Sequence, residues 1–260
     1  MRIKLALAVI ASLVAIPAFA ADRPARGIYV GVFGGGGTST DTDVVQRGTA
    51  YFIEAQGGPL SINAIGQTDS GGVGFVGGQI GYEISYPSVV LPAFEIEGFY
   101  LDADTRNATL QNSNVRGAEQ TFDNTFPMHS AVLLANLVFS FPTVYPGVTP
   151  YIGGGIGAAS VDVDSAKSLQ TNPAEGALNH FNSGPDASAW TFAAQIKAGI
   201  RIAISSNAYV FGEYRYLYLG AVDQSFGPTV EAAHAATSAW TVSFDETSYH
   251  LGTAGIGFNF

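Results

Sequence analysis

The stretch "WTFAAQIKAGIRIAI" at residues 190–204 decides the fold. Its even positions are all apolar, whereas its odd positions carry the polar residues Gln195, Lys197 and Arg201. A β-strand sends alternate side chains to opposite faces, so a strand separates these two sets cleanly. A helix would instead mix the basic residues with the isoleucines on one surface. The stretch therefore predicts a strand with one wholly apolar face.

The following segment completes a hairpin. After a short link at 205–207, three tyrosines at alternate positions of "AYVFGEYRYLYLG" (208–220) share one face, and Glu213 and Arg215 share the other. A tight turn between two alternating runs is typical of antiparallel strands. The same reading along the chain predicts eight strands, at 27–38, 71–86, 93–104, 127–141, 150–161, 188–204, 208–220 and 247–260.

The predicted connections alternate in length. Three are short, at 87–92, 142–149 and 205–207, whereas the other four, near 39–70, 105–126, 162–187 and 221–246, are long and rich in polar residues. This alternation is typical of an up-and-down barrel in an outer membrane, with short periplasmic turns and long extracellular loops. Eight strands also place both ends of the chain on the periplasmic side.

Residues 1–20 have the features of a cleaved signal peptide, because a basic start precedes a short apolar run and an Ala-Phe-Ala ending. We therefore predict one barrel domain over residues 21–260. Without Arg2 and Lys4, nine basic and 21 acidic side chains give this domain a formal charge of −12, which disfavours nucleic acid as a partner. The chain has no cysteine, and its 12% of charged residues is about half the usual share. An exported, weakly charged, aromatic-rich chain favours a membrane β-barrel.

A soluble lipocalin-like barrel is the alternative, since it also has eight strands and a signal peptide. Such a barrel would place its apolar residues inside and its polar residues outside. Here the apolar face is broad and aromatic and the polar face carries opposite charges, so the apolar face suits contact with lipid.

Several segments resemble a known family: "AFEIEGFYLDAD" (93–104), "TPYIGGGIGAAS" (149–160), the hairpin from 190 to 220 and "YHLGTAGIGFNF" (249–260). They resemble the opacity-protein-like, OmpA-like β-barrel surface antigens of Gram-negative outer membranes. The resemblance implies an outer-membrane location, lipid and lipopolysaccharide neighbours, and a non-enzymatic role in envelope structure and in adhesion or immune recognition. It implies no cofactor.

The strand parity predicts a polar cluster in the lumen. Its members are Gln79, Glu83, Glu95, Glu97, Asn136, Lys197, Arg201, Glu213 and Arg215. Four acids and three bases in a narrow interior are expected to pair, because an unpaired buried charge is unfavourable. The favoured interpretation is a structural plug of ion pairs, and the alternative is a small or gated pore whose selectivity these residues set.

Pairs of aspartates follow three upward strands at the predicted outer rim. They are Asp41 and Asp43, Asp102 and Asp104, and Asp162 and Asp164. Carboxylate pairs can hold hard divalent cations, but solvated acidic loop bases are the favoured interpretation, so no metal site is predicted.

A third functional alternative is an enzyme that modifies lipid A. Ser248 and His250 are two residues apart and so face the same side of the predicted strand, near Asp245 and Glu246. Nucleophilic catalysis can use such a group of a serine, a histidine and an acid. The order Ser-x-His reverses that of the lipid A deacylase barrels, and a histidine at this height suits an aromatic belt. We therefore predict no catalytic residue.

The last residues predict how the chain reaches its location. Thr253, Gly255, Phe258 and Phe260 resemble the C-terminal signal that the barrel assembly machinery recognises in outer-membrane proteins. Function is then left to the long loops, which are expected to meet any host or cell-surface ligand. The apolar segment at 50–66 is expected to cover the barrel mouth or contact a partner, and residues 230–240 to form a short helix.

Overall fold

The structure is a computed structural model, and it describes residues 27–84 and 90–260, without the side chains of residues 103 and 104. The predicted signal peptide at 1–20 lies outside the described residues, as do the last residues of the predicted strand 71–86. No helix within the described ranges is long and apolar enough to cross a membrane.

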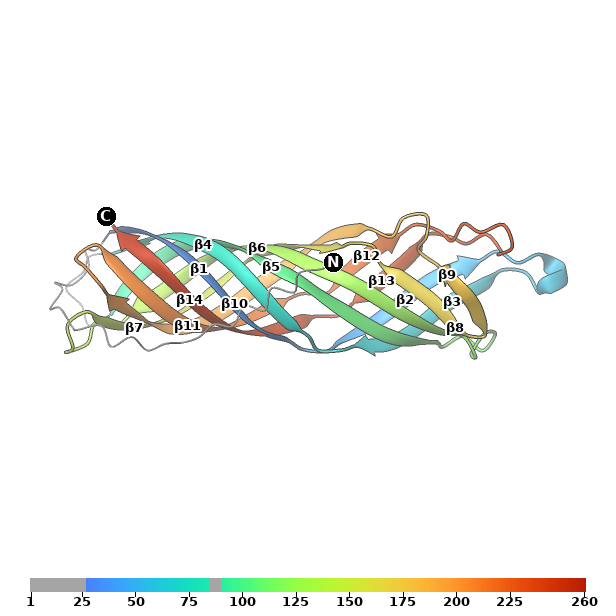
Figure 1. Cartoon of the computed structure of the whole chain (residues 1–260), viewed down its shortest axis with the longest axis horizontal. Coiled ribbons are helices and arrows are strands. Elements are labelled where there is room, and N and C mark those ends of the chain that lie inside the picture. Colours follow the sequence, from blue (N-terminus) through green and yellow to red (C-terminus); the bar gives the residue numbers. More distant parts are fainter. Residues whose placement is uncertain (1–26, 85–89) are drawn as a thin grey trace, which may run out of the picture.

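Eight long antiparallel strands close into a barrel (Figure 1), as predicted. They are β1 (Ile28–Ser39), β4 (Gly72–Glu83), β5 (Leu91–Asn112), β6 (Thr121–Ser140), β7 (Val148–Val163), β10 (Ala187–Ala203), β11 (Ala208–Leu219) and β14 (Thr247–Asn259). The barrel is closed because β5 pairs with both β4 and β6, while β1 pairs with the last strand, β14. The C-terminus lies at the end that carries the short turns, which is the periplasmic end of the predicted topology (Figure 1).

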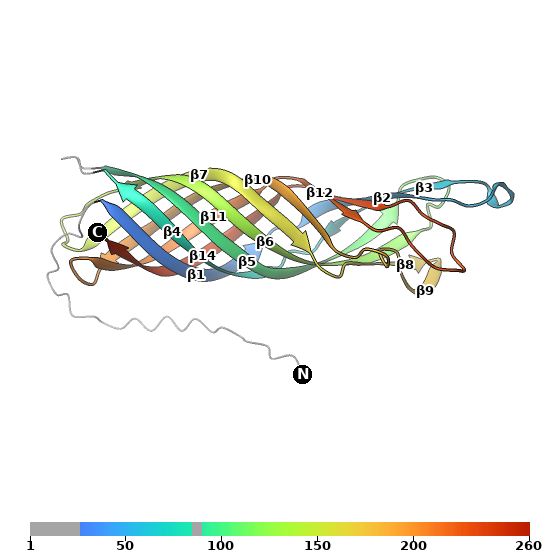
Figure 2. The same cartoon turned by 90° about the horizontal axis from the view of Figure 1, so that it is seen from above.

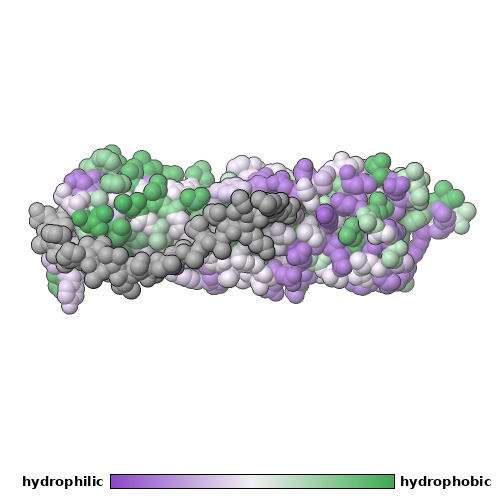
Figure 3. Space-filling model, in the orientation of Figure 1, coloured by the Kyte–Doolittle hydropathy of each residue, from purple (hydrophilic) through white to green (hydrophobic). Residues whose placement is uncertain are grey.

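The outer face of this barrel is apolar, as the alternation in 190–204 predicts. Trp190 is 72% exposed and Ile196 is 63% exposed, whereas Gln195 and Lys197, on either side of Ile196, are buried. Green hydrophobic surface accordingly gathers over one half of the molecule in Figure 3, and purple hydrophilic surface over the other. For the eight-stranded barrel, the alternative of a soluble barrel is wrong, because the apolar side chains face outward.

The long connections contain strands, which corrects the expectation of irregular loops. Further strands are β2 (Thr42–Ala50), β3 (Leu60–Thr68), β8 (Lys167–Asn172), β9 (Ala174–Asn179), β12 (Val222–Phe226) and β13 (Trp240–Phe244), with a 3-10 turn, η1 (Glu54–Gln56). Most of the predicted loop 105–126 is the continuation of β5 and β6. The helix expected at 230–240 is absent, and turns occupy this described segment instead.

These strands build a second tube on top of the first. We call it the extracellular tube; it comprises β2, β3, β8, β9, β12, β13 and the ends of β5 and β6 that meet at residues 113–120. Its two sides are joined by a backbone hydrogen bond from Gly227 to Gly184 and by reciprocal bonds between Asn182 and Val230, each 2.9 Å long. Figure 2 shows that β5 and β6 run through both tubes.

The extracellular tube has the reverse pattern of the membrane barrel. Its interior is a hydrophobic core that includes Phe122, Phe126, Phe181, Phe226 and Trp240. In the outer part of β5, Thr105, Asn107, Thr109 and Gln111 face solvent while the alternate residues are buried. This part of the molecule is therefore packed like a water-soluble β-barrel.

A β-bulge at the rim marks the change from one pattern to the other. The pairing of β5 with β6 shifts register between Leu101 and Asp104. Before the bulge the inward residues of β5 are odd-numbered, ending at Leu101, and after it they are even-numbered, starting at Arg106. An extra residue in one strand reverses which side chains face inward, so the alternation of the sequence breaks here.

Glycine makes room for inward aromatic rings. Tyr29 of β1 is paired in register with Gly81 of β4, and a Cβ on Gly81 would overlap the Tyr29 ring. The same cross-strand pairing of a ring with a glycine occurs for Phe33 with Gly77, Tyr151 with Gly199, Tyr209 with Gly257 and Phe211 with Gly255. A narrow lumen can hold these rings only because their partners have no side chain.

Candidate functional site

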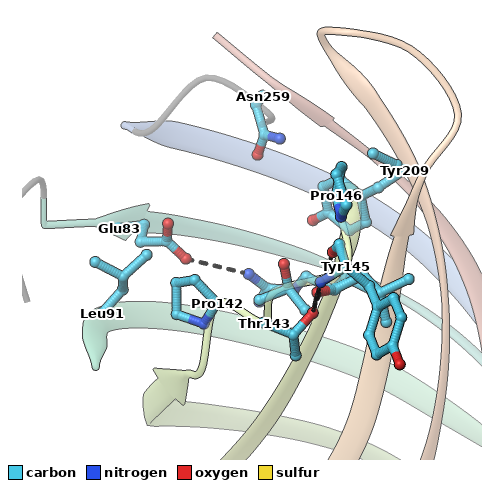
Figure 4. Close-up of a pocket in the computed structure, with 13 residues that line it drawn as sticks. Glu83, Leu91, Pro142, Thr143, Tyr145, Pro146, Tyr209 and Asn259 are labelled. Carbon is cyan, nitrogen blue, oxygen red and sulfur yellow. Dashed lines mark hydrogen bonds and ion pairs between the residues drawn. The ribbon is translucent and has the colours of Figure 1, made fainter. Parts of the chain in front are cut away.

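The lumen of the membrane barrel contains the predicted polar residues, arranged in layers along its axis. The lowest layer centres on Arg201. Its guanidinium lies over the rings of Tyr29, Tyr151 and Tyr209, at 4.9, 4.8 and 5.5 Å from their centroids. Arg201 Nη1 also lies 3.5 Å from Glu83 Oε2. A pocket that opens at the periplasmic mouth is lined by Glu83, Arg201, Tyr209 and Asn259, together with the 142–149 turn (Figure 4).

The middle layer is a buried network of opposite charges. Lys197 Nζ lies 2.6 Å from Glu95 Oε1 and 2.8 Å from Glu97 Oε2. Asn136 donates to both carboxylates, and Tyr29 donates to Glu95 Oε2 at 2.9 Å. Because these carboxylates have hydrogen bonds as well as a cation, the network meets the condition under which buried charge is tolerated.

Arg215 extends the network to a second pair of carboxylates. It forms ion pairs with Glu97 and Glu213, and Glu213 also accepts a hydrogen bond of 2.6 Å from Tyr151. The side chains of Arg215 and Glu97 have no exposed surface. Of the predicted cluster, the network unites Glu95, Glu97, Asn136, Lys197, Glu213 and Arg215, with Gln79 buried beside it, whereas Glu83 and Arg201 lie together in the layer below.

An aromatic layer covers the network on its extracellular side. The ring centroids of Phe33, Phe75 and Phe99 lie 6.0 to 6.3 Å from one another. The Arg215 guanidinium lies 4.2 Å from the centroid of the Phe33 ring. These rings belong to a continuous hydrophobic cluster that includes Leu217 and Leu251. Hydrophobic side chains therefore fill the lumen at this level, above the charges.

Arg106 occupies the junction between the two tubes, and the sequence reasoning missed it. It is 2% exposed, and its guanidinium donates to Thr40 O at 3.2 Å, to Thr68 Oγ1 at 3.4 Å and to the Tyr249 hydroxyl at 3.5 Å. The residue falls in a predicted loop, and only recognition of the bulge at 101–104 would have assigned it to the interior.

The predicted rim aspartates Asp43, Asp162 and Asp164 have neighbours among the described side chains. Asp43 accepts a hydrogen bond of 2.7 Å from Gln67, and His129 lies 3.5 Å from Asp164 and 3.9 Å from Asp162. Among the side chains that the structure describes, these aspartates form no group of three potential metal ligands. Such a group occurs instead on the extracellular tube, where Glu175, His180 and His234 meet, and the sequence reasoning did not identify it.

Ser248 and His250 do not contact each other as a catalytic pair. Ser248 Oγ lies 2.7 Å from the Tyr216 hydroxyl, and His250 Nδ1 lies 2.6 Å from the Tyr214 hydroxyl. Both tyrosines belong to the neighbouring strand β11. Each side chain is thus engaged by a tyrosine on the outer face of the barrel.

The C-terminal side chains lie on the faces of the last strand that its predicted alternation requires. Phe258 and Phe260 point outward and are 44% and 72% exposed, while Thr253 and Asn259 are buried in the lumen. The backbone N–H of Phe260 donates to Ile28 O at 2.9 Å, so the final residue is paired with the first strand.

Comparison with known proteins agrees with this architecture. Residues 6–260 match the outer membrane protein beta-barrel domain. None of the curated proteins matches the chain by sequence.

Solved structures with a similar course of the chain are outer-membrane barrels of low sequence identity. Neisserial surface protein A is 15% identical, with 90% of this chain and 97% of that chain covered and a TM-score of 0.38. The outer membrane protein OprG from Pseudomonas aeruginosa is 13% identical, with coverage of 92% and 98% and a TM-score of 0.42. Ail, the attachment invasion locus protein of Yersinia pestis, solved with the heparin analogue sucrose octasulfate, is 12% identical, with coverage of 89% and 99% and a TM-score of 0.31.

The family match extends over almost the entire chain, and the closed barrel with its outward-facing apolar surface agrees with the description of that family. The chain therefore belongs to the family of the outer membrane protein beta-barrel domain and is a protein of the Gram-negative outer membrane.

Proposed function

We propose that this protein is a non-enzymatic surface protein, closed to solutes, that anchors a rigid extracellular tube in the outer membrane. The observation that carries the proposal is the filled lumen. The pairs formed by Lys197 with Glu95 and Glu97 are nearly inaccessible to solvent, and the rings of Phe33, Phe75 and Phe99 pack above them. An ion pathway needs a continuous wet lining, whereas here charge neutralises charge and apolar side chains fill the space above.

The extracellular tube supplies the surface for interaction. Its interior is occupied by its own hydrophobic core, so its role lies in the groups that it presents outward. At the hairpin of β2 and β3, Tyr51 is 52% exposed and Ile53 is 65% exposed. Val115, in the turn between β5 and β6, is 95% exposed, and its neighbour Arg116 donates hydrogen bonds to the carbonyls of Gln56 and Gly58 in that hairpin. Exposed apolar groups gathered at a tip favour contact with another surface.

Conductance separates a closed anchor from a pore. The refolded full-length protein is added to a planar lipid bilayer at both polarities, and a general porin in the same bilayer serves as positive control. We expect insertion without stable current steps. Reproducible current steps from the wild-type protein would establish the pore instead.

Attachment tests the role of the tip. Cells that display the Tyr51→Ser/Ile53→Ser variant are expected to attach to hydrophobic polystyrene less than cells with the wild-type protein. A matched control is Val144→Ser/Tyr145→Ser, because these side chains are also exposed but lie on the periplasmic turn. Equal attachment by all three strains, at equal amounts of surface protein, would show that the tip does not contribute to attachment.

A catalytic role is tested separately through lipid A. We expect the mass spectrum of lipid A to be the same in cells with and without the protein. A new lipid A species that disappears in the Ser248→Ala variant would contradict a non-enzymatic role.

A further inference from the structure

Three potential metal ligands converge on the extracellular tube, at a distance from the lumen. Glu175 belongs to β9, His180 follows that strand, and His234 lies in the segment between β12 and β13. His180 Nε2 and His234 Nε2 each lie 3.3 Å from Glu175 Oε2, and the three ligand atoms are all within 4.8 Å of one another. Two separate connections of the chain thus meet at one carboxylate oxygen.

The second nitrogen of each imidazole is already engaged by the backbone. His180 Nδ1 lies 3.0 Å from Ser168 O, and His234 Nδ1 lies 2.6 Å from Ala235 O. A carbonyl oxygen can only accept, so both rings donate through Nδ1. This fixes the tautomer and leaves both Nε2 atoms directed at Glu175. Histidines that bind metals are usually held in this way by a hydrogen bond from the other ring nitrogen.

The contacts to Glu175 have the spacing of ligands around a metal ion. Charge-assisted hydrogen bonds between nitrogen and oxygen are about 2.7–2.9 Å long, which is shorter than these contacts. Tetrahedral zinc with Zn–N of about 2.0–2.1 Å and Zn–O of about 2.0–2.2 Å separates neighbouring ligand atoms by about 3.3–3.5 Å. Glu175 Oε2 is also buried, and it accepts no hydrogen bond from the part of the chain that the structure describes.

The surroundings hold the ligands in place and leave one side open. His180 is 2% exposed and packs edge to face on Phe122 and Trp240. Glu175 and His234 line a pocket on the tube surface together with Glu231, which gives access to a metal ion and room for a fourth ligand.

We propose that Glu175, His180 and His234 form a binding site for a divalent transition metal of the zinc class, which joins the β8–β9 connection to the β12–β13 connection. Imidazole and carboxylate ligands in a set of three suit Zn²⁺. Ca²⁺ and Mg²⁺ are disfavoured because they prefer sites built from oxygen ligands. The metal ion would bridge His234, in the bend between β12 and β13, to His180, whose ring centroid lies 5.5 Å from that of His234.

The test is calorimetric titration of the refolded, metal-free full-length protein with ZnCl₂, and with CaCl₂ and MgCl₂ in parallel. We expect saturable binding of one Zn²⁺ per chain and no saturable binding of Ca²⁺ or Mg²⁺. His234→Ala and Glu175→Gln are expected to weaken Zn²⁺ binding by about 100-fold or more, since loss of a ligand exceeds the 10- to 100-fold effect of losing a group that only orients one. His234→Cys, which keeps a ligand, is expected to retain binding.

The other two histidines of the chain provide matched controls. His129→Ala and His250→Ala remove one imidazole each, outside the proposed site, and are expected to bind Zn²⁺ like the wild type. Heat-modifiable mobility on gels verifies that every variant is folded. Co²⁺ replaces Zn²⁺ for spectroscopy, where intense visible absorption bands indicate tetrahedral coordination. Absence of saturable Zn²⁺ binding, wild-type affinity in His234→Ala and Glu175→Gln, or loss of binding in His129→Ala would each overturn the proposal.

Discussion

Lys197 lies between Glu95 and Glu97 in the centre of the membrane barrel, with its Nζ at 2.6 Å from one carboxylate and 2.8 Å from the other. The lysine comes from β10, and the glutamates come from β5 on the other side of the lumen. This relationship ties two strands that are not neighbours in the sheet. It makes the barrel interior sensitive to the loss of a single charge.

Replacement of the lysine tests this sensitivity. Lys197→Met keeps most of the side-chain volume but leaves two buried carboxylates without their common cation. Removing one partner of a buried ion pair costs about 3–5 kcal/mol, and we expect a decrease of this size in the free energy of unfolding in urea. Lys167→Met is the matched control, because Lys167 is exposed on β8 and its loss is expected to change the free energy by less than about 0.5 kcal/mol. Equal stability of the two variants would contradict the role of the network.

Gly81 is required by the ring that lies over it. In Gly81→Ala the new methyl group overlaps the Tyr29 ring, which must then leave Glu95 Oε2. Overpacking of this kind costs about 1–3 kcal/mol, measured as a lower midpoint of urea unfolding. Gly72→Ala, also on β4, places its methyl group where no atom lies within 4 Å, so it serves as control. A Gly81→Ala protein as stable as Gly72→Ala would show that the ring can move without loss.

Arg106 is expected to hold the extracellular tube on the membrane barrel. Arg106→Gln removes the hydrogen bonds to Thr40 O, just after β1, and to the Tyr249 hydroxyl on β14. These two oxygens then lose the donor that they have in the wild-type protein. We expect a loss of about 1–3 kcal/mol and faster cleavage of the extracellular tube by proteinase K. Arg47→Gln is the control, since Arg47 makes an exposed hydrogen bond to Ser243. Faster cleavage in both variants alike would mean that the junction has no special role.

The final residue tests the predicted assembly signal. Phe260 contributes one backbone hydrogen bond to β1, and its side chain faces outward. Its deletion therefore removes little packing from the folded barrel, and we expect its main effect to be less heat-modifiable protein in the outer membrane. Phe94→Ala removes an equally outward-facing ring outside the signal and is expected to insert normally. Normal insertion of the deletion variant would contradict the signal.

The sequence predicted the membrane barrel well because its alternation is simple. In residues 190–204 the apolar side chains face lipid and the polar side chains face the lumen, and the structure has the same division. The positions of Glu95, Glu97 and Lys197 followed from strand parity alone. Their partners Tyr29 and Tyr151 did not, because an aromatic residue suits either face of such a strand.

The extracellular tube was missed because its strands follow other rules. In β2, Gln46 is buried while Val45 and Arg47 face away from the core, so neither face is purely polar or apolar. Gln46 is accommodated inside by hydrogen bonds to Asn124 and Ser168 from distant strands. The bulge at 101–104 further reversed the parity of β5. The group of Glu175, His180 and His234 depends on contacts between two separate connections, which no local spacing indicates.

The continuous strands β5 and β6 have a mechanical consequence. Their 22 and 20 residues run as single strands through the lipid-facing wall, past the bulge at 101–104 in β5, to the distal turn. A force applied at that turn is carried by rows of backbone hydrogen bonds into the wall of the barrel. We therefore expect the surface anchor that we propose to be a stiff post rather than a flexible tether, which would hold a contacted surface at a fixed height above the bilayer.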